Sequence, residues 1–252
     1  RRPSVVDKVS HVLAASRACV RALRAHRRLP ITADGTSVCF PQLSVIDGRR
    51  IAYLSQLRRN VFRVMVDERL LCVLKLSHSA YGRDAHEAAF AEGVAPRLLA
   101  VESFGANGEA VLMEHAPPGF KRWNEREWDV DDPREEAGVT AIRRAVLQLH
   151  ASGYVHGDIR GVNLLVRADE AEGAVDVMIV DFDWAGRERV VVYPRPPNRD
   201  GDPPIPWHPD VQQYSKILAS HDMYLIEHGI RAGAHRVPGG AVAIAAGGAG
   251  EP

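Results

Sequence analysis

The feature that most constrains this chain is a polar loop between two apolar runs in its second half. Residues 154–166 have the sequence YVHGDIRGVNLLV, which places His156, Asp158 and Asn163 in one short polar segment. The apolar run VMIV and then the triplet DFD at 181–183 follow. Apolar runs on both sides of a polar excursion are typical of a β-hairpin. The pattern predicts that acidic, amide and imidazole side chains gather near this hairpin.

The residues before this loop predict an antiparallel sheet with one helix. Five β-type runs are separated by polar turns: IAYLSQL, VFRVMV, LLCVLKLS, PRLLAVESFG and EAVLMEH. A helix over about 83–92 is expected between the third and fourth runs, because Gly93 and Pro96 end the pattern. Apolar residues at helical spacing predict a long helix over 134–153, and a last helix is expected over 211–228.

These elements divide the chain into four expected parts. Residues 1–40 form an N-terminal helical extension, and residues 41–117 a first lobe of five strands and one helix. Residues 118–236 form a second, mainly helical lobe, and 237–252 a disordered Ala/Gly tail. The expected fold class is therefore α+β, with two lobes and an antiparallel sheet in the first.

Composition excludes several functions. Lys+Arg and Asp+Glu both number 32, so no global field draws the chain to nucleic acid or to an anionic membrane. Nucleic-acid binding by the arginine-rich first helix has little support, because no aromatic platform accompanies it. The cysteines, Cys19, Cys39 and Cys72, fit neither a disulfide framework nor a zinc knuckle. We expect a reducing, cytoplasmic compartment.

The polar loop resembles the catalytic loop of protein kinases. His156, Asp158 and Asn163 have the spacing of H-R-D-L-x-x-x-N, and the segment 181–183 stands where D-F-G would. The HGD form is similar to aminoglycoside and choline kinases and to the basidiomycete-type kinase-like proteins of fungi. The resemblance spans about residues 48–228 and is strongest over 146–185. It implies a bilobal protein kinase-like fold with a shortened C-lobe.

The resemblance also implies roles for the loop residues. Asp158 would accept the proton of an attacking hydroxyl, and Asn163 and Asp181 would hold Mg²⁺ with ATP. Arg160 would take the place of the loop lysine that touches the transferred phosphate, and His156 would brace the loop. The alternative is that Asp and Asn near strand ends only cap turns.

Lys75, in LCVLKLS, matches the lysine of V-A-I-K, which in kinases bridges ATP phosphates to a helix carboxylate. The alternative is a lysine that snorkels from a strand edge. The helix RDAHEAAFAEG offers Asp84, Glu87 and Glu92 as carboxylates. Asp84 best matches the family position and Glu87 keeps the usual residue type. The alternative for both is a solvated surface charge, which is the commoner case for helix carboxylates.

Residues Met113, Glu114 and His115 resemble the strand end and hinge where the kinase backbone binds adenine. An ordinary apolar strand is the alternative there. The glycine-rich loop of kinases is missing, because SQLRRN stands between the first two strands; Arg58 and Arg59 either replace its charge or form a solvated turn. Asp222 either holds the catalytic loop from beneath or caps a helix.

These patterns favour a phosphotransferase that uses ATP and Mg²⁺ and transfers phosphate to a hydroxyl acceptor. A protein Ser/Thr hydroxyl is the first expectation, and a small molecule of the aminoglycoside or choline type is an alternative. The missing glycine loop and the short second lobe motivate a third reading, a pseudokinase that docks partners without catalysis. The expected partners are ATP and the acceptor, with no nucleic acid and no membrane.

Overall fold

The computed structural model describes residues 43–104, 108–126, 128, 132–169, 174–200 and 204–231. All of these except Leu43 lie in the unit that begins at Ser44, and that unit alone is described below. The expected N-terminal helical extension and the expected Ala/Gly tail lie outside the described residues. In the described ranges, no helix combines the length and the apolar character needed to cross a membrane.

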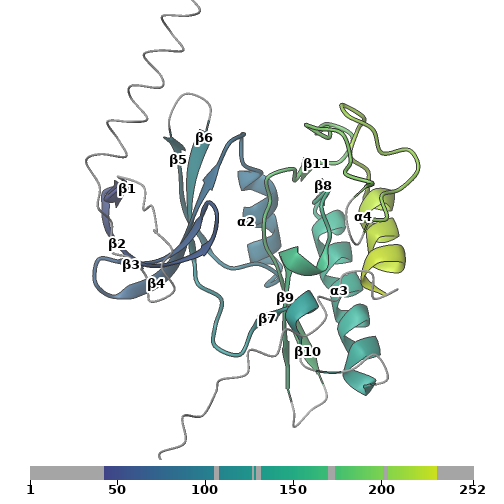
Figure 1. The fold of residues 1–252 in the computed structure, drawn as a ribbon, viewed down its shortest axis with the longest axis horizontal. Helices are drawn as coiled ribbons and strands as arrows, with labels where there is room; N and C mark the ends of the chain where they lie inside the picture. Colours follow the sequence, from purple (N-terminus) through teal and green to yellow (C-terminus); the bar gives the residue numbers. More distant parts are fainter. Residues whose placement is uncertain are drawn as a thin grey trace, which may run out of the picture. The chain divides into compact units, whose positions relative to one another are not determined.

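One antiparallel sheet forms the first part of the unit (Figure 1). Its strand order is β1-β2-β3-β4-β6-β5. The strands are β1 (Val45–Ile46), β2 (Arg49–Arg58), β3 (Val61–Val66), β4 (Leu70–Ser77), β5 (Leu98–Phe104) and β6 (Gly108–Glu114). The sheet has six strands where five were expected, because the turn Asp47-Gly48, with positive φ at both residues, adds the short β1 as a hairpin.

Side-chain alternation explains why the middle strands form where the sequence predicts. Phe62, Val64 and Val66 in β3 are buried while the residues between them are more exposed. Strand β4 pairs with β3 so that Val61 lies opposite Lys75. Period-two burial of this kind fixes the register, because a slip by one residue would expose the apolar face.

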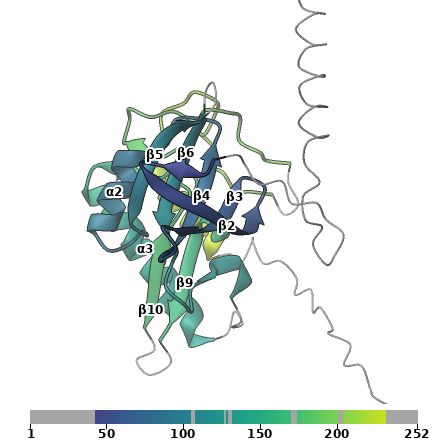
Figure 2. The ribbon, with the colours of Figure 1, turned by 90° about the vertical axis from the view of Figure 1, so that its left-hand side faces the viewer.

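Helix α2 (Arg83–Ala91) follows β4 and turns Ala85, His86 and Ala89 inward. Figure 2 shows α2 at the edge of the sheet beside β5. The backbone amide of Gly82, just before the helix, donates to the Phe182 carbonyl over 3.0 Å. A Cβ on Gly82 would lie 2.5 Å from the Ala185 carbonyl oxygen, so only glycine allows this approach.

The second part of the unit is built on helix α3 (Pro133–Ala151) and the hairpin of β9 (Leu164–Ala168) and β10 (Val175–Ile179). The predicted helix and hairpin are both confirmed. Asp132 caps α3 by accepting from the Arg134 amide at 2.9 Å. The short strand β7 (Lys121–Arg122) pairs with β9, and β8 (Tyr154–Val155) pairs with β11 (Gly186–Arg187).

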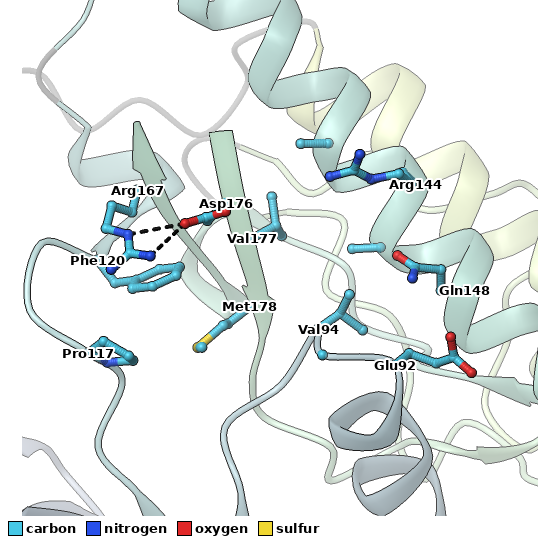
Figure 3. Close-up of a pocket in the computed structure, with 13 residues that line it drawn as sticks. Glu92, Val94, Pro117, Phe120, Arg144, Gln148, Arg167, Asp176, Val177 and Met178 are labelled. Carbon is cyan, nitrogen blue, oxygen red and sulfur yellow. Dashed lines mark hydrogen bonds and ion pairs between the residues drawn. The ribbon is translucent and has the colours of Figure 1, made fainter. Parts of the chain in front are cut away.

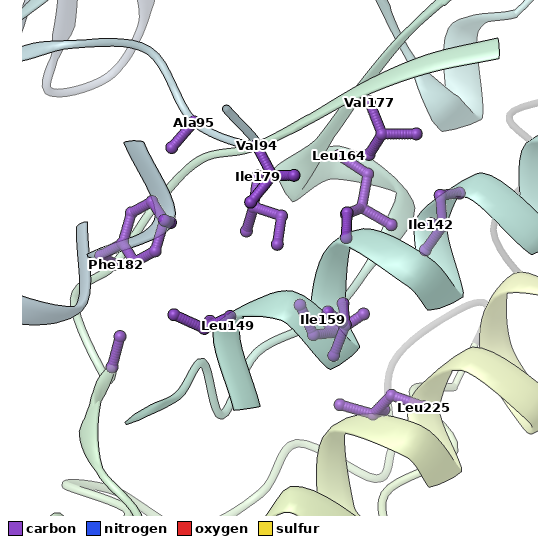
Figure 4. Close-up of a cluster of buried hydrophobic side chains, with 14 of the residues drawn as sticks. Val94, Ala95, Ile142, Leu149, Ile159, Leu164, Val177, Ile179, Phe182 and Leu225 are labelled. Atoms are coloured by element: carbon purple, nitrogen blue, oxygen red, sulfur yellow. The ribbon is translucent and has the colours of Figure 1, made fainter. Parts of the chain in front are cut away.

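The core of this part lies between α3, the hairpin and helix α4 (Ala219–Leu225). Figure 4 shows Ile142 and Leu149 of α3 in one cluster with Ile159, Ile179 and Leu225. All five side chains are buried. Because Ile159 belongs to the polar loop, this packing fixes the backbone of that loop to the helices below it.

The last helix begins later than predicted. The sequence favoured a helix over 211–228, but α4 covers Ala219–Leu225 and continues as a π-helical turn, Ile226–Ile230. The residues before it pair with a distant segment instead, since the amide of Tyr193 donates to Ser215 O and that of Ile217 to Val191 O. Pairing with a distant segment thus overrides the local helical pattern.

Candidate active site

Four segments bring the polar residues of the predicted site together. Lys75 comes from the centre of β4, and Asp158 and Asn163 come from the loop between β8 and β9. Asp181 follows β10, and Asp222 lies in α4 beneath the loop. Hydrogen bonds or ion pairs link members of this set across the two parts of the unit.

The Lys75 ammonium group contacts two carboxylates, those of Asp181 and Asp183. Its Nζ lies 2.7 Å from Asp183 Oδ1. The Lys75 side chain is only 10% exposed, so the snorkelling alternative is wrong. Asp183 stands where kinases have the glycine of D-F-G, and sequence reasoning did not single it out as a site residue. The signal was available, since the triplet DFD was recognised as a departure.

The pKa values of Asp181 and Asp183 shift in opposite directions. Burial alone would raise the pKa of Asp181, but the charge and hydrogen bond of Lys75 outweigh it and lower that pKa. Burial raises the pKa of Asp183; Lys75 opposes this and the charge of Asp181 reinforces it. Two neighbouring acids that share one cation separate in this way because both cannot be equally stabilised as anions.

The backbone of Asp181 has φ +73°, in the left-handed region that non-glycine residues rarely adopt. Such a conformation costs about 1–3 kcal/mol and is found mainly where function requires it. Here it places the Asp181 carboxylate against Lys75.

Asp158 is held by its neighbours in the loop. Arg160 donates from Nε to Asp158 Oδ1 over 2.6 Å and from Nη2 to Oδ2 over 2.7 Å. The Asn163 side-chain nitrogen donates to Asp158 Oδ2 and to the Asp158 carbonyl, each over 2.9 Å. Burial alone would lower the pKa of Arg160, but the Asp158 carboxylate outweighs it and raises that pKa. The predicted trio Asp158, Arg160 and Asn163 therefore forms one connected unit.

Asp222 supports the loop from beneath. It is fully buried, and its carboxylate accepts from the His156 amide at 2.8 Å and the Gly157 amide at 2.7 Å. His150 Nε2 of α3 lies 3.0 Å from the same carboxylate. The capping alternative is wrong, because residue 218 is the N-cap of α4 and Asp222 lies inside the helix.

The HGD glycine has a structural cause. Gly157 has φ +79°, and a Cβ there would lie 2.8 Å from the Ile217 side chain. His156 braces the loop as expected: its Nδ1 accepts from the Asp158 amide at 3.2 Å, and its Nε2 lies 3.2 Å from the Val180 carbonyl. These contacts require the neutral tautomer with hydrogen on Nε2.

The expected partners of Lys75 on helix α2 are not in place. Asp84 and Glu87 are exposed, as is Glu92. The inward position of α2 holds His86, whose ring stacks on Phe182 at 4.6 Å and 5°. Helical geometry explains the difference, because the buried stripe passes through residues 85, 86 and 89.

Residues 113–115, the strand end expected to bind adenine, already pair with neighbouring segments. Met113 is buried and pairs with Val73, while Glu114 and His115 are half-buried. The Glu114 amide donates to the Arg97 carbonyl and the His115 amide to the Leu71 carbonyl. Neither amide is therefore available to a purine in this structure.

The turn between β2 and β3 consists of Arg59 and Asn60 and carries no glycine. Partial burial and the nearby Arg122 lower the pKa of Arg58, whereas Glu125 and Asp181 act in the opposite direction. Arg58 is therefore close enough to sense the charge of Asp181, although it belongs to the opposite part of the unit. Both Arg58 and Arg59 are exposed to solvent.

The residues present fit a nucleotide with magnesium. Asp181 and Asn163 carry oxygen atoms, the ligands that Mg²⁺ prefers, and Mg²⁺ is commonly held by one or two carboxylates together with phosphates. The side-chain nitrogen of Asn163 donates two hydrogen bonds to Asp158. The side-chain oxygen of Asn163 is therefore the atom suited to bind a cation. Lys75, Arg58 and Arg160 supply the positive charge that phosphate groups require.

A cavity lies away from Lys75, Asp158, Asn163 and Asp181 (Figure 3). It has a volume of about 480 Å³, and Glu92 is the one candidate site residue among those that line it. Its walls come from α3, the β9–β10 hairpin, the loop after α2 and the segment after β6, and include Arg144, Gln148, Arg167, Asp176, Glu92 and Phe120. Figure 3 shows the ion pair of Arg167 and Asp176 at one side of this cavity.

Comparison with known proteins agrees with this geometry. Residues 119–194 match the model of the lipopolysaccharide kinase (Kdo/WaaP) family, a stretch that includes Asp158, Asn163 and Asp181. No curated protein sequence matches the chain.

Among solved structures, vaccinia related kinase 3 is similar with a TM-score of 0.54 and 14% identity, over 77% of this chain and 68% of that one. The Cydia pomonella granulovirus kinase PK-1 matches with a TM-score of 0.48 and 16% identity, over 70% of this chain. The match spans 65% of the viral kinase, slightly less than two thirds of its length.

The fold is similar to that of a protein kinase. The matched segment is similar to the lipopolysaccharide kinase (Kdo/WaaP) family.

Proposed function

We propose that this chain is a phosphotransferase that uses ATP with Mg²⁺ and transfers the γ-phosphate to a hydroxyl group. The observation that carries the proposal is the convergence of Lys75, Asp158, Asn163 and Asp181 from separate segments into one connected set. Phosphoryl transfer depends on positioning and charge stabilisation, and these are the side chains it needs in one place.

Each residue has a role that its contacts support. Asp158 accepts the proton of the acceptor hydroxyl, and Asn163 and Asp181 hold the metal. Bound Mg²⁺ would neutralise the charge that develops on the phosphoryl oxygens. Lys75 orients the phosphates, and the backbone around residues 113–115 lies beside the adenine, through groups other than the two committed amides.

Arg160 has two alternative partners in this proposal. Without nucleotide it pairs with Asp158 through two hydrogen bonds. A phosphate group offers the guanidinium the same two-point geometry. Arg160 would move to the transferred phosphate and thereby release the Asp158 carboxylate to act as a base.

The acceptor is proposed as a class. A protein Ser/Thr hydroxyl and a small-molecule hydroxyl require the same base and the same metal ligands. The family matched over 119–194 is named for lipopolysaccharide, which supports a non-protein acceptor. The resemblance of the HGD loop to that of aminoglycoside and choline kinases supports a small-molecule acceptor as well.

A pseudokinase is the competing proposal. Two observations favour it: the β2–β3 turn offers no glycine-rich backbone to phosphates, and the amides of Glu114 and His115 are already paired. A pseudokinase would bind partners, with or without nucleotide, and would never turn ATP over.

The test has two stages. Calorimetry with Mg·ATP on the parent and on a Lys75→Ala, Asp181→Ala double variant should show binding that only the parent retains. Transfer to a panel of proteins and of sugars and other small alcohols should then occur with the parent. It should fall by about 10²–10⁴-fold in Asp158→Ala, the range for loss of a general base.

The matched control is Asp176→Ala, which removes an exposed carboxylate paired with Arg167 and should leave both readouts unchanged. A folded parent without nucleotide affinity would refute the proposal. Binding without transfer to any acceptor would favour the pseudokinase.

A further inference from the structure

Lys75 pairs with acids that follow β10, whereas the kinase resemblance predicts an acid of helix α2 as its partner. We infer that Asp183 anchors Lys75 for nucleotide binding, in the role that the kinase resemblance assigns to a carboxylate of helix α2. The inference rests on the proposed function, because the lysine is assumed to orient phosphates. It assigns a positioning residue that the motif comparison did not identify.

Helix α2 supplies no anchor in this structure. Its acidic residues, Asp84 and Glu87, are exposed, and its first inward polar side chain is His86. His86 is committed elsewhere: its Nδ1 lies 2.9 Å from the Tyr81 hydroxyl and its Nε2 2.8 Å from the Pro96 carbonyl. The helix therefore turns an imidazole inward and keeps its carboxylates at the surface.

Asp183 is in contact with the ammonium group that needs a partner. The distance from Lys75 Nζ to Asp183 Oδ1 is 2.7 Å, and the Lys75 side chain is nearly buried. A buried ammonium group without a carboxylate partner is costly, so its position depends on the acids around it. The two acids that contact it come from the same triplet, 181–183.

The two acids differ in what else they must do. Asp181 is the proposed metal ligand, and a carboxylate bound to Mg²⁺ has less charge left for a lysine. Asp183 would then be the carboxylate that keeps Lys75 in place. A glycine at this position, as in D-F-G, could not supply that contact.

The backbone around Asp183 is suited to a fixed anchor. The Phe182 carbonyl accepts from the amides of Gly82 at 3.0 Å and Ala185 at 3.2 Å. The Phe182 ring is fully buried between His86 and His156. These contacts hold the residue before Asp183 on both sides, so the carboxylate is presented from a rigid segment.

A double-mutant cycle tests the contact without any nucleotide. Unfolding in urea is measured for the parent, Lys75→Met, Asp183→Asn and the double variant. If Asp183 anchors Lys75, the effects are not additive, because each single change already removes the pair. Additive effects would overturn the inference whatever the nucleotide does.

A second measurement separates positioning from mere stability. ADP affinity is measured in the presence of Mg²⁺, so that Asp181 is engaged by the metal and Asp183 is the carboxylate left to Lys75. Asp183→Asn should weaken ADP binding about tenfold, a loss of about 1.4 kcal/mol for an ion pair that positions Lys75. The double variant should bind no more weakly than Lys75→Met, and Asp183→Glu should recover part of the affinity.

Asp84→Asn and Glu87→Gln are the matched controls, since they remove the helix carboxylates and should leave ADP affinity unchanged. Loss of affinity in a control, or full affinity in Asp183→Asn, would overturn the inference. A folded parent that binds no ADP would refute the proposed function and the positioning role with it, while the unfolding cycle would still decide whether the pair exists.

Discussion

Replacing Asp222 by Ala removes the carboxylate on which the polar loop rests. The side chain is fully buried and accepts from two buried backbone amides, His156 N at 2.8 Å and Gly157 N at 2.7 Å. His150 Nε2, at 3.0 Å, loses its partner as well. Without the carboxylate these groups stay unsatisfied or the loop shifts.

The magnitude follows from these contacts. A buried donor left without an acceptor costs about 1–3 kcal/mol. Two amides and an imidazole, at about 1 kcal/mol or more each, give a loss of at least about 3 kcal/mol, which agrees with the range of about 3–5 kcal/mol for removing one partner of a buried charged pair. That is a large part of the total stability of about 5–15 kcal/mol that a domain has.

The assay is urea unfolding of the parent and the variant, followed by fluorescence of the tryptophans. Asp222→Ala should lower the midpoint with an unchanged slope. Asp176→Ala is the control: it removes one partner of the exposed Arg167 pair and should cost less than about 1 kcal/mol. An Asp222→Ala variant within about 1 kcal/mol of the parent would refute the role assigned to these hydrogen bonds.

Three further predictions concern the first part of the unit. Gly82→Ala should destabilise the fold by about 1–3 kcal/mol, because its Cβ would lie 2.5 Å from the Ala185 carbonyl oxygen; urea unfolding measures this. Burial lowers the pKa of His86 to about 4, so stability is full above pH 6.5 and falls as pH drops toward 4; between pH 7 and 5 the parent should lose about 2 kcal/mol more than His86→Gln. Burial raises the pKa of the Cys72 thiol to about 11, so peptide mapping should find it alkylated at pH 8 only after unfolding.

The sequence predicted the strands and helices that are specified by the order of their own apolar and polar residues. Strands β3 and β4 begin and end at the predicted residues, since alternation of apolar and polar side chains specifies both the strand and its buried face. Helix α3 was predicted from apolar residues at helical spacing, and the hairpin after the polar loop from two apolar runs around a polar segment. The polar loop was recognised because the spacing of His156, Asp158 and Asn163 matches that of the kinase catalytic loop.

The sequence could not show contacts made by distant segments. The start of α4 was misplaced because residues 214–217 pair with residues 191–193, and nothing near residue 211 signals this. The choice between Asp84 and Glu87 as the partner of Lys75 failed for a similar reason. Helical periodicity does not show which side of α2 faces Lys75. The structure shows that the inward side chain is His86, which stacks on Phe182.

The missing glycine-rich loop affects which groups near Asp181 could bind phosphate. In kinases that loop covers the phosphates with backbone amides, whereas here the β2–β3 turn is only two residues long and its strand ends in Arg58. Arg58 is within electrostatic reach of Asp181 and Arg160. A guanidinium attracts phosphate at longer range than an amide does and needs no close approach of the main chain. The absent glycines therefore argue against a backbone cradle and not against phosphate binding by side chains.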